Sequence, residues 1–99
     1  MKESLIQKKI IAYLNSKGCY SIKTILTNRS GCPDVICCYK GLFLALEVKN
    51  EKGRVSELQK YHIEEIKKAG GVASIVRSVS DVKKIFKTID ESFTSQILK

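Results

Sequence analysis

The sequence predicts an α/β fold: a single small domain with the element order α-β-β-β-α-β-α and a mixed central sheet flanked by helices. Three segments repeat their apolar residues at helical spacing, whereas four others are rich in β-branched, aromatic and aliphatic residues. The helix expected between the third and fourth strands makes a crossover connection, so the sheet should contain parallel as well as antiparallel pairs. Of the 99 residues, 43% are hydrophobic. That size fits one core, and we expect residues 1–99 to form one domain.

The first helix is predicted over residues 3–17 and ends at Gly18, because glycine readily adopts a left-handed conformation. Its apolar residues recur at helical spacing: Leu5, Ile6, Ile10, Tyr13 and Leu14. Residues 19–26 alternate in part and are rich in β-branched residues, which favours a strand. Residues 27–33 contain asparagine, serine, glycine and proline and are typical of a loop.

A β-hairpin follows, with arms at residues 34–39 and 42–49 and a turn at Lys40-Gly41. A symmetric loop centred on this turn pairs residues whose numbers add to 81. A three-residue loop would instead shift the pairing by one residue and move the side chains of one arm to the opposite face of the sheet.

Two acidic residues and a lysine meet if the register is symmetric. Asp34 then lies opposite Glu47 on one face of the sheet, with Cβ atoms about 5 Å apart. Lys49 shares this face because side chains alternate along a strand. We therefore expect the two carboxylates and the ammonium group to form one cluster.

The second helix is predicted to start at Ser56, after a polar connection over residues 50–55. Ser56 and Gln59 have the Ser-x-x-Gln spacing of a capping box, and Gly70-Gly71 ends the helix. Its apolar side consists of Leu58, Tyr61, His62, Ile66 and Ala69.

Residues 72–76 are interpreted as a short buried strand, after which Ser80 is expected to cap a third helix that continues through residue 89. The apolar stripe of this helix comprises Val82, Ile85, Phe86 and Ile89. Residues 90–99 lack a strong pattern. We expect them to fray, or to dock on the core or on a partner through Phe93, Ile97 and Leu98.

Charge indicates the kind of partner. Eighteen basic residues against ten acidic ones give a net charge of +8, which favours a polyanionic partner, above all nucleic acid. The plainer alternative is a basic protein without such a partner. No helix combines a lysine-rich face with a broad aromatic face, which argues against binding to membranes.

The cysteines and the N-terminus indicate the compartment. Cys19, Cys32, Cys37 and Cys38 include no Cys-x-x-Cys, so we interpret them as reduced thiols rather than as a zinc or redox site. No stretch approaches the ~20 apolar residues of a membrane span, and the N-terminus does not resemble a signal peptide. We expect a cytoplasmic protein, located in the host cytoplasm if the chain is viral.

The acid-x-Lys triplet occurs three times, and on its own it carries little information. Two copies, Glu65-Ile66-Lys67 and Asp81-Val82-Lys83, lie in predicted helices and fit solvated faces. Only Glu47-Val48-Lys49 ends a hydrophobic strand and has a Pro-Asp dipeptide, Pro33-Asp34, across a hairpin. The alternative is that these are exposed polar residues at strand ends.

Two opposed carboxylates require a cation. Hard divalent ions such as Mg²⁺ bind the oxygens of carboxylates, carbonyls and water, which Asp34, Glu47 and the backbone of Val48 can supply. Lys49 is not a magnesium ligand, but its ammonium group can orient water and stabilise charge on a phosphate under attack. Together with the basic charge, these residues predict hydrolysis of a phosphodiester.

The chain resembles the PD-(D/E)XK nucleases and, within them, the virus-type replication-repair (VRR-NUC) branch. The resemblance covers most of the chain and rests on Glu3 with Gln7, Gly31-Cys32-Pro33-Asp34, Glu47-Val48-Lys49, Gly53-Arg54-Val55-Ser56, Gln59 and Gly70-Gly71. It implies a restriction-endonuclease-like fold in which Asp34, Glu47 and the Val48 carbonyl bind Mg²⁺ or Mn²⁺ and Lys49 assists the water. It also implies that Glu3 reaches the metal shell and that Gln59 supports the site.

The resemblance further implies cleavage of DNA that leaves a 5′-phosphate. Small standalone members resemble dimeric resolvases that act on branched DNA such as Holliday junctions. We therefore expect DNA as partner, a homodimer, and no small-molecule cofactor. A dimer would present two sites to the two strands of a junction.

The supporting residues have simpler explanations as well. Gln59 can serve as the capping partner of Ser56, and Glu3 can complement the positive end of its helix. Gln7 fits an exposed helix position, and His62 fits a partly packed one. Five basic residues flank the site and are expected either to contact phosphates or to be plain surface: Lys8, Lys9, Arg29, Lys52 and Arg54.

Three functions compete at this point. The leading hypothesis is a metal-dependent DNA endonuclease that is selective for DNA structure. The alternative is a non-catalytic nucleic-acid-binding module with the same fold. A third is an interaction domain that recruits a repair or replication protein through residues 93–98.

Overall fold

Four strands form the middle layer of the protein: β1 (Tyr20–Lys23), β2 (Val35–Tyr39), β3 (Leu42–Val48) and β4 (Val72–Val76). They are described by a computed structural model that covers residues 1–97. The strands lie in the order β1-β2-β3-β4, with antiparallel pairing from β1 to β3 and parallel pairing of β3 with β4. The mixed sheet and the predicted order of elements are confirmed.

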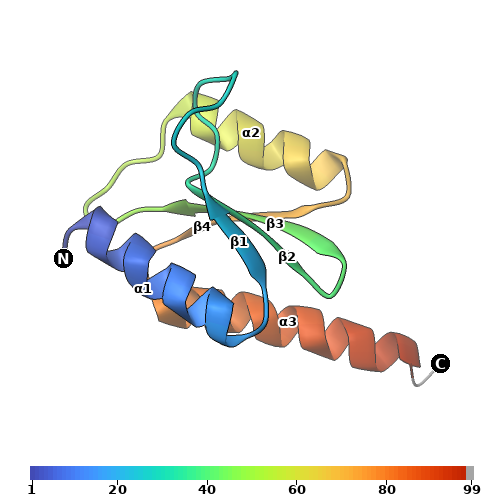
Figure 1. The fold of residues 1–99 in the computed structure, drawn as a ribbon. Helices are drawn as coiled ribbons and strands as arrows, with labels where there is room; N and C mark the ends of the chain where they lie inside the picture. The colour runs from blue at the N-terminus through green and yellow to red at the C-terminus, as the bar shows by residue number, and fades with distance from the viewer. Residues whose placement is uncertain (98–99) are drawn as a thin grey trace.

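Three helices cover this sheet: α1 (Glu3–Ser16), α2 (Glu57–Lys68) and α3 (Val79–Ile97). Figure 1 shows α1 and α3 on one side of the sheet and α2 on the other. From its side, α2 contacts β3 and β4. Within the described part of the chain, no helix covers β1 and β2 from that side. One half of one sheet face is therefore left open.

The main core lies between the sheet and the pair α1 and α3. Inward-facing residues of β2 and β3, such as Val35 and Leu44, pack there against Ile10, Leu14 and Phe86. The Phe86 ring stacks on Tyr39, with centroids 4.3 Å apart. A smaller cluster of Ala45, Ile63 and Ala73 lies under α2. The alternation of these two clusters along β2 and β3 determines which way each side chain of the hairpin points.

The hairpin has the predicted register. Val35 pairs with Leu46 and Tyr39 with Leu42, so paired residue numbers add to 81. Lys40 and Gly41 both have positive φ, of 52° and 81°, as a two-residue hairpin turn requires. Because Val35 and Leu46 point toward α1 and α3, the residues next to them in the chain point toward α2.

The first strand is shorter than predicted, spanning Tyr20–Lys23 rather than residues 19–26. The N–H of Thr24 still donates to the Asp34 carbonyl at 2.8 Å. Ile25 and Leu26 have strand-forming side chains, but β2 begins at Val35 and leaves them no partner strand. They are 89% and 93% exposed. Strand pairing, rather than local propensity, thus ends β1.

The third helix differs from the prediction at both ends. Ser78, rather than Ser80, precedes the helix and accepts a hydrogen bond from the Asp81 N–H at 3.2 Å. Residues 90–97, for which fraying and docking were both open, continue α3. Asp90 accepts hydrogen bonds from the Tyr39 hydroxyl at 2.7 Å and from Lys40 Nζ at 2.8 Å, and Phe93 packs on the core as expected. Docking through Ile97 and Leu98 lies outside the described side chains.

All four cysteines are free thiols, of which Cys19 and Cys37 are buried and Cys38 is exposed. Burial raises the pKa of Cys37 to about 12, which keeps this thiol protonated. Across the described residues, no helix is long and apolar enough to cross a membrane.

Candidate active site

Asp34 and Glu47 meet on the α2 side of the sheet. Asp34 directly precedes β2, and its Oδ2 accepts a hydrogen bond from the Val48 N–H at 2.9 Å. Glu47 is the last residue but one of β3 and is only 2% exposed. Burial and, after it, the neighbouring Asp34 carboxylate raise the pKa of Glu47, so the two acidic groups interact. The structure thus brings together the acidic pair that the hairpin register predicts.

The Glu47 carboxylate has one occupied and one free oxygen. Its Oε2 accepts a hydrogen bond from Gln59 Nε2 at 3.1 Å and lies 3.6 Å from Lys49 Nζ. Its Oε1 is buried and has no hydrogen-bond partner within the described chain. A buried oxygen without a partner is costly unless a ligand satisfies it.

Burial raises the pKa of Glu47 to about 8. The hydrogen bond and the negative charge of Asp34 add to this increase, whereas the nearby Lys49 ammonium opposes it. The site therefore favours a proton, or another cation, between its two carboxyl groups at neutral pH.

Lys49 is enclosed by the loop that follows β3. Its side chain is 13% exposed. A Cβ placed on Gly53 would lie 3.2 Å from Cβ and Cδ of Lys49 and 2.7 Å from Oε2 of Glu3. The absence of a side chain at Gly53 thus lets the loop close over the lysine.

Glu3 reaches this loop from the first turn of α1. Its Oε2 lies 3.3 Å from the Asn50 N–H, from which it accepts a hydrogen bond. Residues 1–97 contain no group of three or more histidine, cysteine, aspartate or glutamate side chains that could hold a metal ion. Glu3 is therefore placed to support the loop and is not grouped with the acidic pair.

The donor set fits a hard divalent cation. It comprises two carboxylates, one with a buried free oxygen, and the backbone carbonyl of Val48 between Glu47 and Lys49. These are oxygen ligands of the kind that Mg²⁺ and Mn²⁺ take, with water completing the shell. The resident ion would also satisfy Glu47 Oε1, which no group of the described chain does.

Gln59 makes contacts to both Ser56 and Glu47. Its side-chain oxygen accepts a hydrogen bond from the Ser56 N–H at 2.9 Å, and its own N–H donates to the Ser56 hydroxyl at 3.1 Å. This is the predicted capping box at the start of α2. The remaining amide nitrogen is the donor to Glu47.

The loop before Asp34 is attached to α2. His62 is buried and lies 2.7 Å, through Nε2, from the Ser30 carbonyl, to which it donates. Gly31 has a φ of +80°, and a Cβ there would lie 2.7 Å from Leu58 Cγ. His62 is thus a packed histidine, as expected, and it holds the loop that carries Asp34.

Arg77 is a supporting residue that sequence reasoning missed. Its guanidinium donates to the carbonyls of Asn50 and, at 3.0 Å, Gly53, so it fastens the loop after β3. The parallel pairing of Val48 with Val76 brings Arg77 beside this loop. An isolated arginine after a predicted strand offers no signal of such a contact.

The five basic residues expected to flank the site are all exposed: Lys8, Lys9, Arg29, Lys52 and Arg54. Arg29 is the one that shares a hollow with Asp34, of about 380 Å³. Lys9 lines a separate pocket between α1 and the start of α3. Gln7, expected to be exposed, is half-buried, and its Oε1 has no partner within the described chain.

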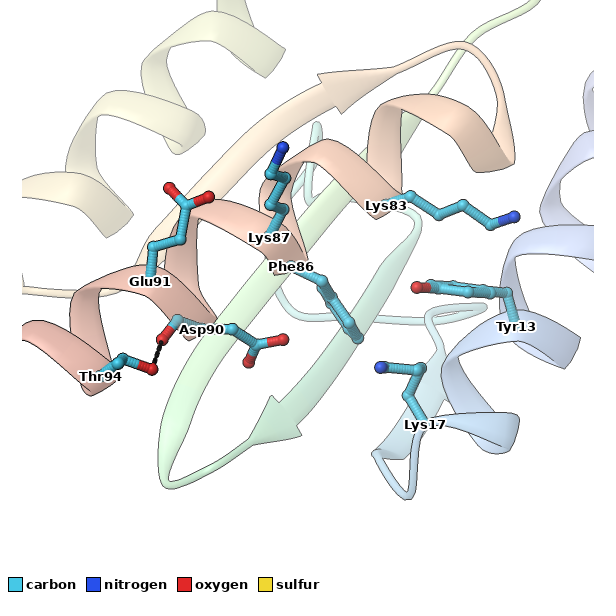
Figure 2. Close-up of a pocket in the computed structure, with 8 residues that line it drawn as sticks. All are labelled: Tyr13, Lys17, Lys83, Phe86, Lys87, Asp90, Glu91 and Thr94. Atoms are coloured by element: carbon cyan, nitrogen blue, oxygen red, sulfur yellow. Dashed lines mark hydrogen bonds between the residues drawn. The ribbon is translucent and has the colours of Figure 1, made fainter.

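A larger groove lies away from the carboxylates. It has a volume of about 630 Å³ and runs between α1 and α3 on the other side of the sheet. Figure 2 shows Tyr13 of α1 and Lys17, which follows α1, facing Lys83 and Phe86 of α3 across it. Lys83 Nζ lies 5.6 Å from the centre of the Tyr13 ring. Asp90 and Glu91 also line this groove, but Asp90 is held by Tyr39 and Lys40. Size alone therefore does not identify the candidate site.

The mixed sheet flanked by helices, with an acidic pair and a lysine on the hairpin, defines a restriction-endonuclease-like domain. Residues 2–80 match the model of the VRR-NUC domain. The chain belongs to the VRR-NUC family, and this membership supports a nuclease. A comparison with curated proteins finds no match.

Solved structures resemble the chain over most of its length. One described as a VRR-NUC domain has 26% identity and a TM-score of 0.75, covering 86% of this chain and 94% of its own. A VRR-NUC domain protein with 17% identity has a TM-score of 0.71 and covers 89% and 87%. Hjc, a Holliday junction resolvase from the archaeal hyperthermophile Archaeoglobus fulgidus, has 20% identity and a TM-score of 0.60, covering 76% and 67%. At 17% and 20% identity, the last two structures show only that their fold is shared with this chain.

Proposed function

We propose that this protein is a metal-dependent endonuclease that hydrolyses phosphodiester bonds in DNA, with branched DNA such as Holliday junctions as its substrate. One observation carries the proposal: the buried carboxylate of Glu47, with a free oxygen, lies beside Asp34 and Lys49. Family membership and the fold shared with the resolvase Hjc support it.

In this proposal Asp34, Glu47 and the Val48 carbonyl hold Mg²⁺ or Mn²⁺. The bound cation supplies a Lewis acid that makes water more acidic and the phosphorus more electrophilic. The Lys49 ammonium group holds the attacking water and stabilises the negative charge that grows on the phosphate. Water attacks phosphorus and the bond to the 3′ oxygen breaks, which leaves a 5′-phosphate and a 3′-hydroxyl.

Glu3 and Gln59 act as positioning residues in this proposal. Gln59 fixes the orientation of the Glu47 carboxylate, and Glu3 fixes the loop against which Lys49 lies. Both act through other residues, as the partners of ligands in metal sites commonly do.

The substrate is proposed from charge and fold. A net charge of +8 favours a polyanion, and the exposed Arg29 lies beside Asp34 where a DNA backbone would pass. Lys8, Lys9, Lys52 and Arg54 are proposed as further phosphate contacts. We also propose a location inside the cell, where a nuclease would meet branched DNA.

We further propose a homodimer that uses the open half of the sheet. Tyr20, Ile22 and Phe43 are 74%, 44% and 46% exposed and lie on that face with the exposed Cys38. An exposed apolar face of this kind is typical of an interface between copies of one chain.

A cleavage assay tests the proposed function. Linear, flap and four-way DNAs are incubated with Mg²⁺, with Mn²⁺ and with a chelator. We expect metal-dependent cutting, strongest on branched DNA, that is lost in the variants Asp34→Asn and Lys49→Ala.

Matched controls come from the exposed triplet on α2. Glu65→Gln and Lys67→Ala alter the same residue types and should leave cleavage unchanged. Undiminished cutting by both site variants would eliminate the mechanism. Salt-sensitive binding without cutting of any substrate would favour a non-catalytic binding module instead.

A further inference from the structure

The most exposed large apolar side chains in the described structure belong to Ile25 and Leu26, at 89% and 93%. They lie in the long loop between β1 and β2. Figure 1 shows this loop rising beyond the sheet beside the N-terminal end of α2. Neither side chain belongs to a core cluster. Two adjacent apolar residues held in water are costly to keep unless they contact a partner.

Hydrogen bonds fix both sides of the base of this loop. They keep the tip projecting from the sheet instead of folding back onto the core. Thr24 Oγ1 donates to the Pro33 carbonyl at 2.7 Å, and the Thr24 N–H donates to the Asp34 carbonyl at 2.8 Å. On the other side of the loop, His62 holds the Ser30 carbonyl at 2.7 Å.

The tip is next to the proposed reaction site. The hollow of about 380 Å³ that contains Asp34 is lined by this same loop, including Ile25, Leu26 and Arg29. Lys23 and Arg29 are both exposed on either side of the tip. An apolar tip flanked by basic residues matches DNA, in which stacked bases lie between charged backbones.

We propose that Ile25 and Leu26 form an apolar wedge that inserts between bases beside the phosphate to be cut. This inference rests on the proposed function and adds a determinant of substrate choice. Unstacking bases is least costly where stacking is already interrupted, as at the centre of a branched DNA. The wedge therefore makes the site selective for branch points over continuous duplex, without contacts to particular bases.

The observations favour DNA over a second protein as the occupant of the tip. The tip has basic neighbours and lines the hollow that contains Asp34, whereas the exposed apolar residues of the open sheet face do not line that hollow. A second copy of the chain is instead proposed to cover that sheet face.

The test uses four-way and continuous duplex DNAs with 2-aminopurine at the branch or at the matching duplex position. Binding is followed by fluorescence in a chelator, where no cleavage occurs. The double variant Ile25→Ser with Leu26→Ser is compared with the control Ile25→Leu with Leu26→Ile, which retains apolar side chains. Thermal unfolding of each variant checks the fold, and exposure of these residues predicts little change.

We expect the wild type and the apolar control to increase fluorescence at the branch and the serine variant to lose this increase. Cleavage of the four-way DNA by the serine variant should fall about tenfold, the loss of one good apolar contact. Unchanged fluorescence and cleavage would overturn the wedge.

Two other outcomes separate the explanations. Sedimentation that shows the serine variant as a monomer where the wild type is a dimer would make the tip a protein contact and would also overturn the wedge. A wild type that never cuts DNA would refute the proposed activity, while loss of the fluorescence increase in the serine variant would still support the wedge.

Discussion

Gln59 links the start of α2 to Glu47. Its amide nitrogen donates to Glu47 Oε2 at 3.1 Å, while its side-chain oxygen accepts the Ser56 N–H at 2.9 Å. One side chain thus orients the buried acid and caps the helix that covers it. The two interactions can be separated by mutation.

Replacing Gln59 with alanine should weaken both stability and metal binding. Ser56→Ala is the matched control, because it removes the hydroxyl of the capping box and leaves the contact to Glu47. Each change should lower the free energy of unfolding by about 1 kcal/mol, the usual value of a helix cap. Only Gln59→Ala should reduce the affinity for Mn²⁺, by about tenfold. Urea denaturation and calorimetric titration measure the two effects, and equal affinities in the two variants would contradict this role of Gln59.

The free energy of unfolding of the metal-free protein should decrease as the pH rises from 4.5 to about 8. The folded state raises the pKa of Glu47 from its ordinary value of 4.5 to about 8, so folding favours the protonated carboxyl group. This stabilisation is complete below pH 4.5 and is lost as the proton leaves. Urea titrations in a chelator across this range should show the slope, and Glu47→Gln should remove its contribution. A wild-type curve identical to that of the variant would disprove the assignment.

Substituting Gly53 by alanine should reduce cleavage more than stability. The new Cβ would lie 3.2 Å from the Lys49 side chain and 2.7 Å from Glu3 Oε2, so both must shift. Gly41→Ala is the contrasting control. Gly41 has a φ of +81° but nothing within 4 Å of a new Cβ, so alanine costs about 1 kcal/mol of backbone strain far from the site. We expect Gly41→Ala to lower the melting temperature and to retain cleavage. A Gly53→Ala protein with full activity would show that the loop does not position Lys49.

Introducing a charge at Tyr20 should weaken the proposed dimer. Tyr20 is 74% exposed, so Tyr20→Lys should leave the folded monomer intact. Leu5→Lys places the same charge at an exposed apolar position on α1 and should have no effect on assembly. Sedimentation equilibrium should show at least about a tenfold increase in the dimer dissociation constant for Tyr20→Lys alone. Wild type that sediments only as a monomer at micromolar concentration, with and without DNA, would refute the dimer itself.

The acidic pair could be predicted from the sequence because its geometry depends on local chemistry. Lys40-Gly41 matches a two-residue turn, and such a turn alone determines which residues of the two arms face each other. The Ser56 and Gln59 spacing similarly defines the start of α2. Both signals lie within a few residues of one another, so no tertiary information is needed.

The features that escaped prediction depend on tertiary contacts. Arg77 fastens residues 50–53 only because β4 pairs in parallel with β3. The continuation of α3 past residue 89 depends on Asp90, which is held by Tyr39 and Lys40 from the hairpin. Ile25 and Leu26 have side chains suited to a strand, yet no strand lies beside them. A sequence pattern does not contain these long-range partners.

The hairpin turn at Lys40-Gly41 has a consequence for how this chain can change over evolution. One extra residue there would turn an arm over, and in β3 this would move the core-facing leucines and Glu47 to the wrong faces of the sheet together. Two extra residues restore the facing pattern. Insertions or deletions at this turn should therefore be tolerated only when they change its length by an even number of residues. The length of a surface turn that takes no part in the site is thus constrained by the faces of the two strands it joins.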